Sequence, residues 1–145
     1  MMKNIPFIAA AAAFFSLTPA VAMAQSTVSG TVTVQKGTGP LLTCTATIGL
    51  NGSSPSTSTQ VTSMSLTGGT LGLCATVQFP NVPHSITQGG GAFQVNDVFA
   101  DTTITAGDCR GNLTGTISGG VITINDILEE VDAGTGDCTI DGSVS

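Results

Sequence analysis

The residues best suited to covalent chemistry in this chain are four cysteines, Cys44, Cys74, Cys109 and Cys138. An even number of cysteines indicates disulfides when a chain is exported to an oxidising compartment. Four cysteines allow three pairings. We favour Cys44–Cys74 and Cys109–Cys138, because each pair closes a loop of about 30 residues between neighbouring strands. A zinc site is the alternative, but the chain has no CxxC pair and only one histidine.

The single histidine, His84, is the first candidate for acid–base chemistry. A catalytic triad needs a histidine close to an activated serine and a carboxylate. Ser85 is adjacent in sequence, but no nucleophile-elbow motif surrounds any serine. Because His84 follows Pro83 in a turn-rich stretch, we expect it to be an exposed loop residue. We name no catalytic residue, and we predict that the protein is not an enzyme.

Acidic side chains are concentrated between Asp126 and Asp137, in a segment that also holds Glu129, Glu130 and Asp132. Dense oxygen ligands suit Ca²⁺, but this spacing fits neither an EF-hand nor a calcium-binding nonapeptide repeat. A glycosidase pair of carboxylates would hold its sugar against aromatic side chains, and the chain has no Trp or Tyr. We expect a solvated acidic loop and name no metal or cofactor, and calcium binding by this loop stays open.

The N-terminus has the three parts of a secretory signal. Lys3 is followed by an apolar stretch over residues 5–17 and by Ala22-Met23-Ala24, a small-x-small cleavage site. The apolar stretch is shorter than the roughly 20 residues of a membrane-spanning helix. We predict cleavage between Ala24 and Gln25, which divides the chain into a signal peptide (1–24) and one exported domain (25–145). The predicted location is outside the cell or on its surface, with the periplasm as the alternative.

The predicted mature chain is strongly acidic and has few charges. Residues 25–145 hold Lys36 and Arg110 against nine acidic residues, a net charge of −7. Such a surface repels phosphate backbones and anionic membranes, so nucleic acid is excluded as a partner. Only 8% of the whole chain is charged, and Thr, Ser and Gly supply its polar surface. This composition is typical of an exported β protein.

Apolar and polar residues alternate along most of the chain, which is typical of half-buried strands. In residues 42–48 the apolar positions include Cys44, so its sulfur is expected to face the core. We expect eight or nine short strands in a single immunoglobulin-like β-sandwich. One of these strands is predicted at 74–79, and one short helical turn at 126–131. A membrane barrel is the alternative, but it would need aromatic girdles, and the mature chain has three Phe.

Four segments resemble those of a bacterial family, the secreted alkane-oxidation activator proteins. In chain order they are residues 28–34 (VSGTVTV), 42–44 (LTC), 71–75 (LGLCA) and 108–113 (DCRGNL). The resemblance implies a non-enzymatic accessory protein that helps cells use poorly soluble hydrocarbons. Its partner would be a hydrocarbon or another hydrophobic surface, which it would contact or disperse at the cell surface.

The strands themselves suggest a second hypothesis. Segments 31–35 and 43–48 combine high β-propensity with few charges, and such strands pair with other chains when they lie at an open sheet edge. The alternative function is therefore a structural subunit of a surface fibre, adhesin or biofilm matrix. It would act through self-association by β-strand pairing.

Overall fold

The computed structural model describes residues 25–52, 59–103 and 105–145. The predicted signal peptide and Ala24 lie outside the described residues, and Gln25 is the first residue described. No helix among these residues has the length and apolar character needed to cross a bilayer. The described elements are β1 (Ser26–Lys36), β2 (Leu42–Leu50), β3 (Gln60–Thr67), η2 (Thr70–Thr76), β4 (Val77–Gln78), β5 (His84–Gly89), β6 (Ala92–Thr102), β7 (Cys109–Ser118), β8 (Val121–Glu130) and β9 (Cys138–Val144).

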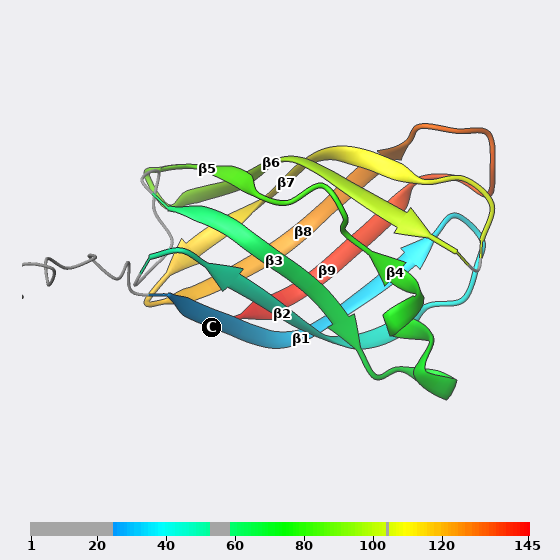
Figure 1. Cartoon of the computed structure of the whole chain (residues 1–145), viewed down its shortest axis with the longest axis horizontal. Helices are drawn as coiled ribbons and strands as arrows, with labels where there is room; N and C mark the ends of the chain where they lie inside the picture. Colours follow the sequence, from blue (N-terminus) through cyan, green and yellow to red (C-terminus); the bar gives the residue numbers. More distant parts are fainter. Residues whose placement is uncertain (1–24, 53–58, 104) are drawn as a thin grey trace, which may run out of the picture.

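The strands close into an eight-position antiparallel β-barrel, in which β4 and β5 share the position between β3 and β6. The first strand lies beside the last: Val34 of β1 is paired with Ile140 of β9, and β1 (blue) runs next to β9 (red) in Figure 1. The prediction of a two-sheet sandwich is therefore wrong. Alternation along each strand defines a buried face, but it does not reveal whether the first and last strands of the sheet are paired with each other. In the barrel they are paired, so their backbone groups are hydrogen-bonded and no sheet edge is left between them.

Apolar side chains fill the barrel interior, while Thr and Ser cover much of its outer surface. In β2, Leu42, Cys44, Ala46, Ile48 and Leu50 are buried, and the threonines at 43 and 45 between them are exposed. An eight-stranded barrel has an interior just wide enough for side chains or for one small ligand. The alternation that the sequence predicts is thus present, but the buried side chains face the axis of a barrel and not a second sheet.

Two glycines allow neighbouring strands to approach closely. A Cβ added at Gly30 would lie 2.0 Å from the backbone oxygen of Ser143, and one at Gly115 would lie 2.1 Å from that of Thr123. Only glycine fits at such positions, because any side chain would force the two backbones apart.

Two local predictions are wrong. Residues 74–79 are not one strand, because η2 occupies Thr70–Thr76 and leaves only the two-residue strand β4. Residues 126–131 do not form a helical turn, because β8 continues to Glu130 and is paired with both β7 and β9. In residues 126–131 tertiary pairing with two strands overrides local propensity.

The barrel closes through a weak seam along β3. This strand is paired with β4 at Ser65 alone and with β5 at Gln60 and Val61 alone. The segment that connects β4 to β5 contains Pro80 and Pro83, which have no backbone N–H to donate. The connection is held to β6 instead of β3, because the Asn81 side chain donates to the backbone oxygen of Asp97 (2.9 Å) and accepts from the backbone nitrogen of Phe99 (3.2 Å).

Candidate functional site

The four cysteines form two disulfides, so the expectation of two disulfides is confirmed. The bonds are Cys44–Cys74 (S–S 2.06 Å) and Cys109–Cys138 (S–S 2.01 Å). The first attaches η2 to β2. The second joins the first residue of β7 to the first residue of β9, and all four cysteines are buried. Both bonds therefore hold the end of the barrel where η2 and the 131–137 connection lie, which we call the loop end.

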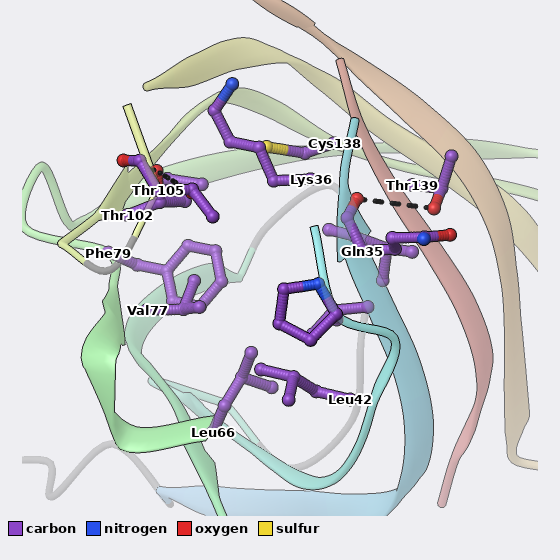
Figure 2. Close-up of a pocket in the computed structure, with 14 residues that line it drawn as sticks. Gln35, Lys36, Leu42, Leu66, Val77, Phe79, Thr102, Thr105, Cys138 and Thr139 are labelled. Carbon is purple, nitrogen blue, oxygen red and sulfur yellow. Dashed lines mark hydrogen bonds between the residues drawn. The ribbon is translucent and has the colours of Figure 1, made fainter. Parts of the chain in front are cut away.

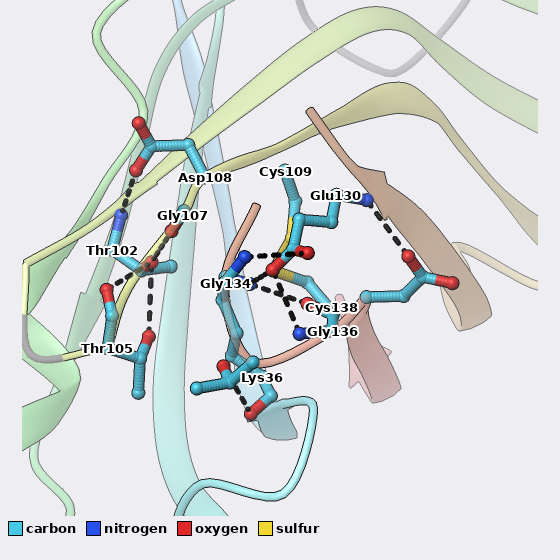
Figure 3. A network of polar contacts seen from close by, with 12 residues as sticks. Lys36, Thr102, Thr105, Gly107, Asp108, Cys109, Glu130, Gly134, Gly136 and Cys138 are labelled. Atoms are coloured by element: carbon cyan, nitrogen blue, oxygen red, sulfur yellow. Dashed lines mark hydrogen bonds and ion pairs between the residues drawn. A yellow bond between two sulfur atoms is a disulfide. The ribbon is translucent and has the colours of Figure 1, made fainter. Parts of the chain in front are cut away.

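A buried ion pair stabilises the same end (Figure 3). Lys36, the last residue of β1, extends the inward-facing row of Val32 and Val34, and its side chain is only 4% exposed. Its ammonium forms an ion pair with Glu130 at the end of β8 and donates to the backbone oxygen of Gly136 (2.5 Å). A charge so far out of water is tolerated only when it is paired and hydrogen-bonded, as here.

The carboxylate of Glu130 organises the connection between β8 and β9. It accepts backbone hydrogen bonds from Gly134 (3.1 Å) and Gly136 (2.9 Å) in addition to the bond from Lys36. The Lys36 hydrogen bond, followed by that from Gly136, lowers the pKa of Glu130 below its ordinary value. Glu130 therefore acts as a structural anion at the loop end.

The first part of the acidic segment lies in β8 and not in a loop, while Glu129, Asp132 and Asp137 are exposed as the solvated-loop expectation requires. Asp126 accepts from the backbone nitrogen (2.7 Å) and hydroxyl (2.8 Å) of Thr114, and Asp137 accepts from the backbone nitrogen of Glu130 (2.9 Å). Within the described ranges, no three His, Cys, Asp or Glu side chains gather as metal ligands would. The Asp126 carboxylate therefore links β8 to β7, and the Asp137 carboxylate binds the end of β8.

The prediction that His84 is an exposed loop residue is wrong. His84 begins β5, its side chain is 3% exposed, and its Nε2 has no hydrogen-bond partner among the described residues. Burial lowers the pKa of His84, while the charge of Asp97 and a backbone hydrogen bond with Asn96 raise it. Ser85 points to the opposite face of the strand, so the two side chains cannot act together.

An apolar cavity of about 40 Å³ lies inside the barrel at the loop end (Figure 2). Figure 2 shows Leu42, Leu66, Val77 and Phe79 around it, from β2, β3, β4 and the connection after β4. The ammonium of Lys36 points away from the cavity toward Glu130, so only its methylene stem faces the apolar space. The site can therefore hold apolar matter, and it presents no unpaired charge.

The loop end also exposes large apolar side chains. Of the five that the described residues expose, three are at this end: Leu41 (64% exposed), Leu71 (93%) and Val131 (48%). Leu71 lies in η2 with a φ of 57°, a left-handed conformation that costs a non-glycine residue about 1–2 kcal/mol. The strained backbone thus projects a leucine fully into water, and strain of this kind is concentrated at functional sites.

The fold and this site define a class: a small, disulfide-bonded β-barrel with an apolar interior and an apolar tip. A family model described as alkane oxidation protein activator, PraA/PraB-like, matches residues 1–145, the whole chain. The chain belongs to this family, as the resemblance in its sequence indicates, and the family is described as an activator and not as an enzyme. Neither the curated proteins nor the solved structures contain a significant match.

Sequence reasoning missed Lys36, Leu71 and Phe79 as residues of interest. Lys36 had a usable signal, because it continues the inward-facing alternation of β1 and its charge would need an acidic partner. Leu71 is flanked by Gly69 and Gly72, which indicates a tight turn but not the exposure of the leucine. Phe79 gave no signal beyond being apolar.

Proposed function

We propose that this protein is a non-enzymatic accessory factor that attaches to hydrocarbon surfaces through its loop end and helps cells to use poorly soluble alkanes. The observation that carries the proposal is the exposure of Leu41 and Leu71 at one end of a barrel whose β2 strand carries exposed threonines on its outer face. The description of the family as alkane oxidation activators supplies the class of substrate.

The energetics favour an apolar phase at this tip. Transfer of a fully exposed leucine from water to hydrocarbon is favourable by about 1.5–3 kcal/mol, and Leu71 is 93% exposed. The Cys44–Cys74 disulfide anchors η2, so the Leu71 side chain is already held outward before contact. A preorganised tip loses little conformational entropy on binding, which increases its affinity.

We further propose that the protein acts outside the cytoplasm. Two disulfides support this location, because they persist in oxidising compartments. The signal predicted in residues 1–24 supports it independently. Cell-surface or periplasmic residence would serve the same role, since both bring the protein close to incoming hydrocarbon.

The alternative role, assembly by strand pairing, is less favoured by the fold. That hypothesis depends on open sheet edges with few charges. In the described residues β1 is paired with β9 on one side and β2 on the other, so the first and last strands protect each other. The seam along β3 leaves ladder positions open, but it is short.

A droplet-binding experiment tests the proposal. We expect the disulfide-bonded protein to bind hexadecane droplets, and the Leu41→Ser/Leu71→Ser variant to bind at least tenfold more weakly because it loses the apolar tip. The matched control is Ile127→Ser, since Ile127 is also exposed (56%) but lies in the barrel wall on β8. Protein remaining in the aqueous phase after centrifugation measures binding. Equal loss in both variants, or no binding by the unmodified protein, would contradict the proposal.

A further inference from the structure

Two apolar cavities and one outer groove of mixed polarity share two lining side chains. The loop-end cavity of about 40 Å³ and a second interior cavity of about 20 Å³, deeper in the barrel, share four lining residues. A groove of about 420 Å³ lies outside them on the β3–β4 seam. Leu66 of β3 and Phe79, just after β4, line all three spaces. These two side chains therefore lie between the outside groove and both interior cavities, together with Val77 at the loop-end cavity and Met64 and Ser65 at the deeper one.

We infer that the barrel interior is a binding site for a single uncharged alkyl chain, which enters through the seam between β3 and β4 when the Phe79 side chain moves. This inference deepens the proposed function and rests on it for the class of ligand. The site is nevertheless separate from the tip, because neither Leu41 nor Leu71 lines any of the three spaces.

Size requires the movement of Phe79. The two interior cavities are smaller than the engineered cavity of roughly 150 Å³ that accepts benzene in another protein. Rotation of Phe79 would join both cavities to each other and to the outer groove. Toward β3 the backbone around it has few restraints, since β4 is paired with β3 at one position only, whereas both residues of β4 are paired with β6.

The polar groups at the loop-end cavity disfavour a charged ligand, because each of them already has a hydrogen-bond or ion-pair partner in the protein. The Thr102 hydroxyl donates to the backbone oxygen of Gly107 (2.6 Å), and the Thr105 hydroxyl donates to the Thr102 hydroxyl (3.2 Å). The Gln35 amide donates to the backbone oxygen of Gly39 (2.9 Å), and the Lys36 ammonium is paired with Glu130. A carboxylate here would lose its water without gaining a donor, which is costly, whereas a hydrocarbon loses nothing.

The test uses dissolved n-hexane and, as the charged comparison of equal chain length, hexanoate at pH 7. Methyl-resolved NMR of the disulfide-bonded protein is expected to show saturable shifts for interior methyl groups with n-hexane and none with hexanoate. The expected set is Val34, Leu66 and Ile140. Shifts confined to Leu41, Leu71 and Val131 would overturn the inference while leaving the proposed function intact, and equal shifts with hexanoate would overturn the ligand class.

Two variants change the site in opposite directions. Ala100→Val adds two carbons at the wall of the loop-end cavity and is expected to weaken hexane binding roughly tenfold. Phe79→Leu shortens the side chain at the seam and is expected to speed hexane entry. Leu71→Ser should leave hexane binding unchanged, which separates this site from the tip. Unchanged affinity in Ala100→Val together with an unchanged entry rate in Phe79→Leu would contradict the inference.

Discussion

Replacing Cys109 and Cys138 together by alanine is expected to lower the free energy of unfolding by about 3–4 kcal/mol. The disulfide joins residues that are 29 positions apart. Without it the unfolded chain gains conformational entropy, because the loop between these residues is no longer closed, and the unfolded state becomes more favourable. It also releases the starts of β7 and β9 at the end where Lys36 is buried. Urea unfolding of the variant and the unmodified protein measures the difference.

The other disulfide provides the matched comparison. Cys44→Ala/Cys74→Ala opens a loop of nearly the same length, 30 residues, so a similar loss of stability is expected. It also frees η2, so this variant should bind hexadecane droplets more weakly under conditions where it stays folded, and the Cys109→Ala/Cys138→Ala variant should not. An unchanged urea midpoint in both variants would contradict the assigned role of the disulfides.

The second large effect is expected from the buried ion pair. Glu130→Gln leaves the ammonium of Lys36 buried without its counter-charge, and we expect the midpoint of thermal unfolding to fall by roughly 10 °C. Lys36→Met is expected to cost less, because the Glu130 carboxylate keeps its two backbone donors, Gly134 and Gly136. Thermal unfolding followed by circular dichroism measures both. The reverse order of midpoints would contradict this assignment.

The same pair gives a pH dependence with a defined sign. Because the pKa of Glu130 is lowered in the folded state, the unfolded state binds more protons as the pH falls. The contribution of Glu130 is therefore complete above its ordinary pKa of 4.5 and is lost as the pH falls through the lowered value. Lys36→Met removes the largest cause of the shift, so stability should depend less steeply on pH below 4.5.

The sequence predicted the strands better than their arrangement. Alternation in 42–48 placed Cys44 on the buried face, and the structure agrees. The same alternation cannot distinguish a sandwich from a barrel, because both bury one face of every strand. The pairing of Val34 with Ile140 joins residues 106 positions apart, and no local pattern encodes it.

The candidate site was less predictable than the fold. His84 was expected in a loop because Pro83 precedes it, but its pairing with Val61 of β3 brings it into the barrel wall. The exposure of Leu71 depends on the backbone conformation of η2, which is imposed by the disulfide and the surrounding glycines. Features that arise from tertiary contacts of this kind leave no periodic signal in the sequence.

The most direct test of the central claim measures oxygen uptake by alkane-oxidising bacterial cells after addition of the purified, disulfide-bonded protein. With hexadecane as substrate, the protein should increase uptake, Ile127→Ser should act like the unmodified protein, and Leu41→Ser/Leu71→Ser should have little effect. With succinate, which dissolves in water, none of the three should change uptake. Equal stimulation on succinate, or full activity of the Leu41→Ser/Leu71→Ser variant on hexadecane, would contradict an accessory role based on hydrocarbon contact.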